Sequence, residues 1–136
     1  MTEQTFTISE GAKRTSKLWK PREYSWAEFT ARLKTPVRTN ETAAQYAAAS
    51  KDQQVEIKDI GGFVGGTLTE SRRSIETVEA RTLVTLDADY PASDFIEIAQ
   101  WQVISAQAIY TTHSHSPEKP RFRLIIPLSR PVTPDE

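Results

Sequence analysis

The alternation of apolar and polar residues is clearest in the second half of the chain, where it predicts three strands. Residues 81–90 form a β-branched, apolar run that ends in acids, and residues 106–113 and 121–128 have the pattern of half-buried strands. Between the first two strands, Ser93 can cap a helix over residues 94–102. The candidate buried side chains of this helix are Phe95, Ile98, Ala99 and Trp101. The second half is therefore predicted to run β-α-β-β.

The beginning of the chain alternates less regularly. "TFTIS" at residues 5–9 predicts a short strand, and the basic stretch that follows is expected to form a loop that holds Trp19. Ser25 and Glu28 stand at the spacing of a capping box, in which each side chain accepts a backbone N–H of the other residue. This pattern predicts a helix over residues 26–34.

The middle of the chain predicts one more helix and a turn rich in glycine. Asn40 is expected to cap an alanine-rich helix over residues 41–51. Residues 54–68, which contain "GGFVGG", are expected to form a strand and a glycine-punctuated turn. The glycines could bring the backbone close to a phosphate, but no helix follows them, so a hairpin or bulge is favoured.

The order of these elements predicts an α+β fold. Residues 81–136 match most of a ferredoxin-like or RRM-like split βαβ sheet, and residues 1–80 form an N-terminal α/β extension. Thr133, Pro134 and Glu136 have the pattern of a helix start. The β-α-β-β unit is therefore expected to be truncated before its last helix and last strand, in a chain that is part of a longer domain.

This topology predicts a cluster of charged side chains at one edge of the sheet, because residues 121–128 would lie between the other two strands. The cluster comprises Asp87, Asp89, His113, His115, Arg121 and Arg123. Asp87 and Asp89 would share one face, with Cα atoms about 6.5–7 Å apart. Carboxylate oxygens at this spacing suit Mg²⁺ or Mn²⁺. An acid pair that only makes a strand end soluble explains the pattern equally well.

The histidines and arginines of this edge allow two interpretations each. His113 and His115 are either a metal-binding pair or polar residues of a strand end and a loop. Arg121 and Arg123 alternate with apolar residues, which predicts one charged face and one packed face of the strand. Two arginines beside a metal site suit a polyphosphate, because each guanidinium group can bind two phosphate oxygens. A solvated sheet face is the alternative.

Composition narrows the classes of function. The net charge is −1, so there is no overall positive field of the kind that attracts nucleic acid, but residues 1–34 carry seven Lys and Arg against four Asp and Glu. The chain has no cysteine, which excludes disulfides and cysteine-bound zinc. It has neither an apolar run of membrane-spanning length nor a signal-peptide pattern, so a cytoplasmic protein without membrane contact is expected.

Several segments together resemble one known family. "LVTLDADY" at residues 83–90 and "YTTHSHSPEKPRFRLIIPLSRPVTPDE" at residues 110–136 resemble phage- and plasmid-encoded primases of the archaeo-eukaryotic primase (primase–polymerase) superfamily. The resemblance extends to "SWAEF", "RTNETAAQY" and "KDIGGFVGG" in the first half, so it covers most of the chain. It implies a DNA primase or polymerase domain, a nucleotidyltransferase that starts or extends a strand on a DNA template.

The resemblance also implies roles for individual residues. Asp87 and Asp89 match the acidic motif that binds Mg²⁺ or Mn²⁺ and are expected to be catalytic. His113, with His115 as the second choice, matches the histidine that contacts the phosphates of the nucleoside triphosphate. Arg121 and Arg123 are expected to neutralise the same phosphates. The third metal-binding acid of the family has no counterpart in this sequence, which leaves the activity of the chain open.

The resemblance further implies a DNA template as a partner and a helicase domain in the same natural protein. Template contacts would fall on local basic and aromatic surface, for which the candidates are Lys13, Arg14, Lys17, Trp19 and Lys20. A solvated loop around a packed Trp19 is the favoured interpretation of that cluster.

Two other functions fit the same residues. One is a metal-dependent nicking endonuclease of the histidine-pair type, although Ser114 stands between the histidines and the helical Tyr46 precedes them in the sequence. The other is a non-catalytic module that binds nucleotides or nucleic acid, which would not need Asp87 and Asp89.

Overall fold

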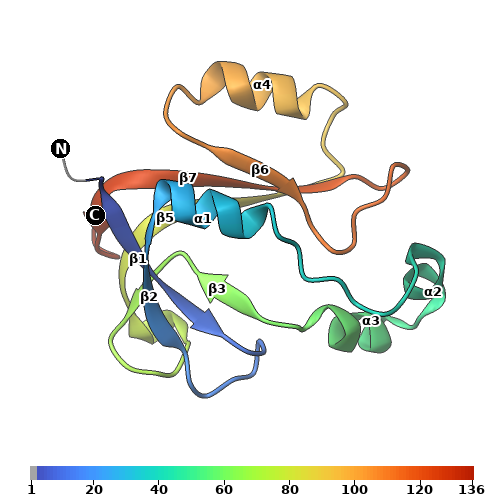
Figure 1. The fold of residues 1–136 in the computed structure, drawn as a ribbon, viewed down its shortest axis with the longest axis horizontal. Helices are drawn as coiled ribbons and strands as arrows, with labels where there is room; N and C mark the ends of the chain where they lie inside the picture. The colour runs from blue at the N-terminus through green and yellow to red at the C-terminus, as the bar shows by residue number, and fades with distance from the viewer. Residues whose placement is uncertain (1–2) are drawn as a thin grey trace.

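The computed structural model describes residues 3–136, which form two antiparallel sheets and four α-helices (Figure 1). The strands are β1 (Thr5–Gly11), β2 (Lys20–Ser25), β3 (Gly62–Val64), β4 (Gly66–Leu68), β5 (Val78–Asp89), β6 (Ala108–Thr111) and β7 (Arg121–Val132). The helices are α1 (Trp26–Leu33), α2 (Ala43–Ala48), α3 (Lys51–Lys58) and α4 (Phe95–Gln102), and a short 3₁₀ helix spans Ile75–Thr77. The predicted α+β class is confirmed.

The larger sheet has the strand order β4-β5-β7-β6. β7 is antiparallel to both of its neighbours, so β5 and β6 run in the same direction and β7 lies between them, as the sequence predicts. α4 packs on one face of this sheet, where the ring of Phe95 stacks on that of Phe122 at 5.9 Å between centroids. The added edge strand β4 is absent from the prediction.

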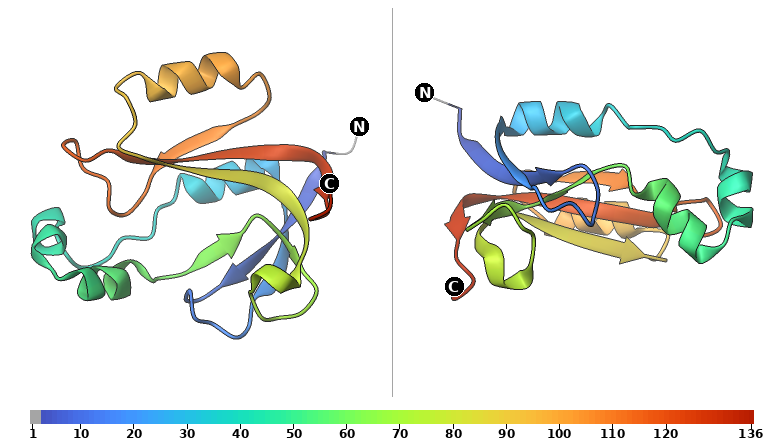
Figure 2. Two further views of the ribbon diagram at one scale, coloured as in Figure 1. Left: turned by 180° about the vertical axis from the view of Figure 1, so that it is seen from behind. Right: turned by 90° about the horizontal axis from the view of Figure 1, so that it is seen from below.

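The smaller sheet, β2-β1-β3, and α1 lie on the other face of the larger sheet (Figure 2). The fully buried side chains that join the two sheets are Ile8, Phe29, Leu83 and Ile125. Phe29 meets the rings of Phe6, Tyr24 and Phe63 edge-on at 5.5–5.8 Å. The core therefore draws on both halves of the chain. The predicted basic loop around Trp19 is shorter than expected, because β2 begins at Lys20.

The capping box of α1 is confirmed, since the Ser25 hydroxyl accepts the Glu28 N–H at 3.1 Å and the Glu28 carboxylate accepts the Ser25 N–H at 2.9 Å. The single helix predicted over residues 41–51 is wrong. Two further capping boxes, at Thr42 and at Ser50, start separate short helices. The Ser50 side chain accepts the N–H of Gln53, which begins α3 where the prediction ends a helix. The strand predicted from residue 54 is therefore the second half of α3.

Two expectations for the helix over residues 94–102 are also wrong. Its N-cap is Asp94 rather than Ser93, and the Asp94 side chain makes no capping hydrogen bond. Ile98 is 43 % exposed and Trp101 is 87 % exposed, whereas Ala99 is buried. The helix covers the sheet along a narrow line through Phe95 and Ala99, so the residues on either side of that line face outward.

The second glycine pair of "GGFVGG" connects the two sheets. β3 and β4 belong to different sheets, so the turn is not the hairpin that was one of the two predicted forms, although the register of β4 does shift between Thr67 and Leu68. The carbonyl of Gly65 accepts the N–H groups of both Thr82 and Leu83, at 2.9 and 3.1 Å. Gly66 lies so close to β5 that a Cβ atom there would collide with the Ala80 carbonyl oxygen. The close approach of the backbone to β5 therefore explains why glycine is needed at these two positions, and no phosphate contact is required to explain it.

Gly66→Ala is expected to destabilise the fold by about 1–3 kcal/mol or more, because the new methyl group must push β4 away from β5. Thermal unfolding followed by circular dichroism measures the effect. Gly62→Ala is the matched control, because nothing lies within 4 Å of a Cβ atom at that position. Equal melting temperatures for the two variants would contradict the tight contact between β4 and β5.

Candidate functional site

The two acids of the D-x-D pattern stand at the end of β5, directly opposite the two arginines at the start of β7. In the register of the two strands Asp87 faces Arg123 and Asp89 faces Arg121. Arg123 donates from Nε and Nη2 to the two carboxylate oxygens of Asp87, at 2.6 and 3.2 Å. Arg121 lies 3.5 Å from the Asp89 carboxylate. The acids and arginines predicted to share one edge are therefore brought together as two cross-strand ion pairs.

The arginines supply the positive charge that two neighbouring carboxylates require. The hydrogen bond with Asp87 raises the pKa of Arg123, so this guanidinium group keeps its charge at any physiological pH. The side chains of Asp87 and Asp89 are 58 % and 57 % exposed, so water and ions reach them from the outside. The expectation that one face of the β7 strand packs and the other is charged needs correction, because Ile125, two residues beyond Arg123 on the same face, is fully buried.

Tyr90, which sequence reasoning did not single out, holds Arg121. It is the one described non-glycine residue with a positive φ, 55°, and it follows Asp89 directly. Its hydroxyl accepts a hydrogen bond from Arg121 at 2.9 Å, and the guanidinium carbon lies 5.1 Å from the centre of its ring. The hydrogen bond raises the pKa of Arg121. An aromatic residue immediately after the acidic motif is the signal that would have found it.

The two histidines have separate partners. His113 lies in the turn after β6, so the expectation that it continues the strand is wrong. Its Nε2 atom is 3.1 Å from the hydroxyl of Thr39, and its ring meets that of Tyr46 edge-on at 4.7 Å. His115 accepts the backbone N–H of Arg121 with Nδ1, at 3.1 Å. Among residues 3–136 no three His, Asp or Glu side chains are grouped closely enough to share a metal ion.

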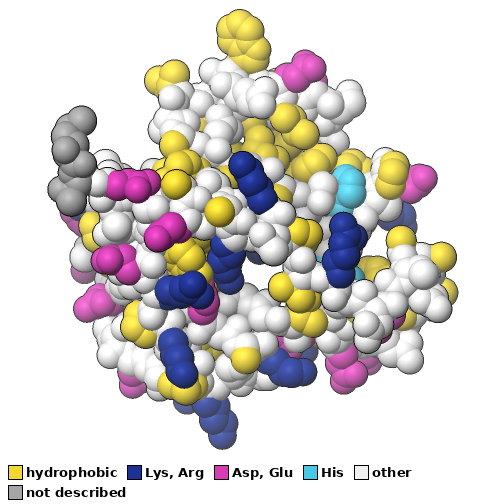
Figure 3. Space-filling model, viewed as in Figure 1, with side chains coloured by type: hydrophobic (Ala, Val, Ile, Leu, Met, Phe, Trp, Pro, Cys, Tyr) yellow, Lys and Arg dark blue, Asp and Glu magenta, His cyan; other side chains and the backbone are white. Residues whose placement is uncertain are grey.

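A large groove of about 2120 Å³ lies beside these residues, between the N-terminal sheet and the ends of β6 and β7. His113, His115, Arg121 and Arg123 line it, and Asp87 and Asp89 are paired with the two arginines of this lining. The lining includes 12 of the 17 Lys and Arg residues of the chain but only three of its 18 Asp and Glu residues. Figure 3 shows Lys and Arg side chains around the central hollow. The net charge of −1 therefore conceals a strongly basic groove.

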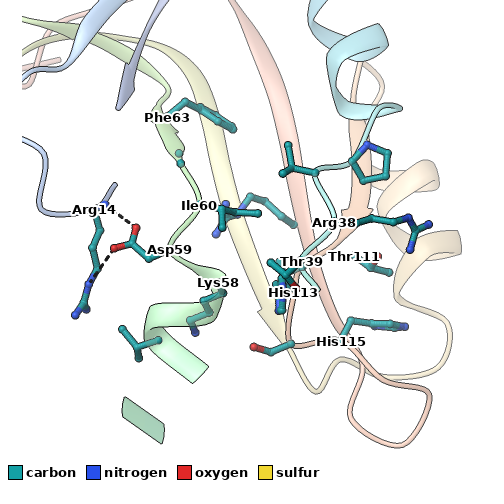
Figure 4. A pocket seen from close by; sticks show the side chains of 18 of the residues that line it. Arg14, Arg38, Thr39, Lys58, Asp59, Ile60, Phe63, Thr111, His113 and His115 are labelled. Carbon is teal, nitrogen blue, oxygen red and sulfur yellow. Dashed lines mark hydrogen bonds and ion pairs between the residues drawn. The ribbon is translucent and has the colours of Figure 1, made fainter. Parts of the chain in front are cut away.

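The cations of the groove come from all its walls. One wall carries Arg14, Lys17, Lys20, Arg32 and Arg73, a second carries Lys34, Arg38, Lys51 and Lys58, and a third carries Lys119, Arg121 and Arg123. Figure 4 shows Arg38, Lys58 and His113 on three different segments that line the groove. The separation of these residues in the sequence explains why composition and local charge clusters did not predict the groove.

Trp19 is 4 % exposed, and its indole N–H donates to the Ser16 carbonyl at 2.8 Å. The favoured interpretation of a packed Trp19 is therefore confirmed, and its covered ring offers no open face for stacking. Arg73 lies over that ring at 4.7 Å, while the side chains of Lys17 and Lys20 remain exposed. The basic cluster around Trp19 thus contributes charge rather than an aromatic surface to the groove.

The fold and the site together define an α+β domain with a cation-lined groove beside a pair of strand-end carboxylates. The chain belongs to the VapE N-terminal domain family, whose model matches residues 1–136. This family is associated with replication proteins of phages and plasmids. No curated protein and no solved structure shows significant similarity to the chain. Within the described part of the chain, no helix has the length and apolar character needed to cross a membrane.

Proposed function

We propose that the chain binds the metal ion and the nucleoside triphosphate in a nucleotidyltransferase of the primase–polymerase type. The observation that carries the proposal is that Asp87 lies opposite Arg123, and Asp89 opposite Arg121, at the edge of a basic groove. Membership of a family associated with phage and plasmid replication supports it. In this function the domain would serve to start or extend a strand on a DNA template.

The donor set of the acid pair fits a hard divalent ion. Mg²⁺ is commonly held by one or two protein carboxylates, with water and substrate phosphates completing its shell. Asp87 and Asp89 are two carboxylates on one strand end, and more than half of each side chain is exposed. They would hold Mg²⁺ or Mn²⁺ together with a triphosphate, which makes a third protein acid less necessary. The bound ion would lower the pKa of the attacking hydroxyl and offset the charge of the triphosphate.

The basic side chains of the same edge would bind the triphosphate. Arg123 presents two donors to Asp87, and the same two donors match a pair of phosphate oxygens. Arg121 is oriented by Tyr90 and faces the groove, so Tyr90 would act as a positioning residue. His113 would donate to the triphosphate from the turn after β6, and His115 would hold the backbone of Arg121 in place.

Arg123→Met is expected to strengthen Mn²⁺ binding when no nucleotide is present. The arginine is a positive charge on the ligand Asp87. Two unit charges about 4 Å apart interact by about 1 kcal/mol in water, and a divalent ion doubles this to about 2 kcal/mol, so the ion would gain roughly 30-fold in affinity. Titration with Mn²⁺ measures this change. The same variant should bind a nucleoside triphosphate less tightly. Arg81→Met, on the same strand pair but outside the groove, is the control. Weaker Mn²⁺ binding by Arg123→Met would contradict the metal site.

One observation favours a second candidate function, nicking of single-stranded DNA. Tyr46 precedes the histidines by many residues, yet its hydroxyl is 2.7 Å from that of Ser114 and its ring contacts His113. A nicking endonuclease needs a tyrosine nucleophile beside a metal-binding histidine pair. The Nδ1 atom of His115 is occupied by a backbone N–H, which leaves only its Nε2 for a metal ion.

One assay tests both functions. The protein is incubated with a primed single-stranded DNA template, nucleoside triphosphates and Mn²⁺, and the DNA products are separated by length. The primase proposal expects longer strands, which Asp87→Asn with Asp89→Asn abolishes and Tyr46→Phe retains. Nicking would give shorter strands and a covalent DNA–protein adduct that Tyr46→Phe removes. DNA binding without either product would leave a non-catalytic binding module and would overturn both proposals.

A further inference from the structure

The groove is bounded by a ring of protein that has one weak joint. At one end its two sides are joined through the backbone at Gly65 and Gly66, where β3 of one sheet leads into β4 of the other. At the other end the segment of residues 34–61, which we call the arm, reaches the turn after β6. Among residues 3–136, the hydrogen bonds of this joint are between side chains: Tyr46 with Ser114 at 2.7 Å, and Thr39 with His113 at 3.1 Å. We call these four residues the latch.

The arm has little else to hold it against the body. Neither α2 nor α3 contains a buried residue. At its base, Asp59 accepts the backbone N–H of Arg14 at 2.7 Å, and its carboxylate lies 3.9 Å from the Arg14 guanidinium, as Figure 4 shows. The arm is fixed at its base and bonded at its tip by only two side-chain hydrogen bonds, so it can open at the latch without loss of core packing.

The charge and the size of the groove identify the kind of ligand. Pockets for small molecules typically enclose about 300–1,000 Å³. The groove has about 2120 Å³ and 12 cationic side chains, four of them on the arm. A single nucleoside triphosphate would fill only part of this space and would meet only some of these cations. An extended polyanion, with one charge at each repeat, matches the distribution of cations over all the walls.

The aromatic side chains of the groove indicate which polyanion it binds, namely single-stranded nucleic acid. Tyr46, Tyr90 and Tyr110 line the groove together with the cations, and none of the three is buried. Proteins that bind single strands combine a basic channel with aromatic rings on which unpaired bases stack. An acidic polypeptide would use the cations but has no bases to stack on the rings.

We propose that the arm closes around one single strand of nucleic acid, so that the strand passes through the ring and the latch is the gate through which it enters. The ligand contacts are the cations of the three walls and the three tyrosines. The inference rests on the proposed function in one respect, because the encircled strand would be the one on which nucleotidyl transfer takes place. It adds a topological link between the protein and the strand, which the proposed function does not require.

A crosslink across the latch tests this directly, because the chain has no cysteine of its own. The variant Tyr46→Cys with Ser114→Cys is joined by a short bismaleimide, either before or after a circular single strand is added. Joining the latch first should weaken binding of the circle at least tenfold and leave binding of a short linear strand, which can thread through the ring. Joining it afterwards should trap the circle on the protein.

Salt separates trapping from ordinary binding. With about six phosphate contacts, the affinity for a single strand falls by about 300-fold between 50 and 200 mM salt. The uncrosslinked protein should therefore release the circle in a high-salt wash, whereas the crosslinked complex should keep it and lose it only when the DNA is cut. Ser114→Cys alone, treated with the same reagent, is the matched control. Release of the circle from a fully crosslinked sample would overturn the proposal, as would equally tight binding of poly-glutamate.

A second variant keeps the test decisive if the double cysteine variant unfolds. Tyr46→Phe with Ser114→Ala removes one of the two hydrogen bonds of the latch without adding a thiol, and it should bind and release circular single strands at least threefold faster than the wild type. Unchanged rates would overturn the gate. Strand extension by the uncrosslinked wild-type protein reports separately on the proposed function. Extension without trapping would contradict only the proposal that the arm encircles the strand. Trapping without extension would contradict only the proposed nucleotidyltransferase activity.

Discussion

Asp87→Asn combined with Asp89→Asn is expected to abolish Mn²⁺ binding, with an affinity loss of at least about 100-fold. Asparagine keeps the size of each side chain but removes both negative charges from the end of β5. Isothermal titration with Mn²⁺, with and without a nucleoside triphosphate, measures the loss. Because Arg121 and Arg123 would then keep no anionic partner on β5, the variant should still bind the triphosphate, but without the added affinity that the metal ion gives.

The matched control for this experiment is Glu76→Gln with Glu79→Gln, which removes the same charge from exposed positions outside the groove. It should bind Mn²⁺ as the wild type does. If the Asp87 and Asp89 variant also binds Mn²⁺ normally, the metal site lies elsewhere, and the two histidines become the candidate metal ligands.

His113→Ala is expected to weaken binding of a nucleoside triphosphate and to leave Mn²⁺ binding intact. A charge-assisted hydrogen bond to phosphate contributes about 1.5–3 kcal/mol, which corresponds to roughly 10–150-fold in affinity. Paired titrations with Mn²⁺ and with the nucleotide measure the two affinities. The nicking function makes the opposite prediction, since there His113 binds the metal ion and nucleotide is irrelevant.

His113 also contacts Thr39 and Tyr46, so its replacement weakens the latch, although the hydrogen bond between Tyr46 and Ser114 remains. Thr39→Val separates the two effects, because it removes the hydrogen bond between the arm and His113 but leaves the imidazole free for phosphate. This control should bind the nucleotide normally. A loss of nucleotide binding in Thr39→Val equal to that in His113→Ala would mean that arm closure, and not the imidazole, governs nucleotide affinity.

Local pattern was enough to predict the second half of the fold. The strands β5 and β7 and the helix α4 have strong periodicity, and the order β-α-β-β leaves few possible topologies. It was therefore possible to predict that β7 lies in the centre of the sheet and that two acids meet two arginines at its edge, namely Asp87, Asp89, Arg121 and Arg123. The exact pairing was not predictable. Whether Asp87 faces Arg123 or Arg121 depends on the strand register, and the sequence pattern does not fix that register to one residue.

The arm shows why the first half was harder. Residues 41–58 are rich in alanine and glutamine and bury nothing, so no apolar stripe marks the helix faces. What divides them into two helices is a pair of side-chain capping bonds, at Thr42 and Ser50, and these were visible as Thr and Ser each followed three residues later by Gln. The contact of Tyr46 with Ser114 joins residues 68 apart in the sequence, which no local pattern can reveal.

The charge distribution of the groove has a consequence for how the protein meets its ligand. With 12 cations around one hollow and 15 of the 18 acids elsewhere, a chain of net charge −1 carries a large electric dipole. Far from a polyanion its net charge gives weak repulsion, but within about 10 Å, the screening length at 0.1 M salt, the dipole turns the groove toward the phosphates. Diffusional encounters should thus become productive mainly in one orientation, with an association rate that falls as ionic strength rises.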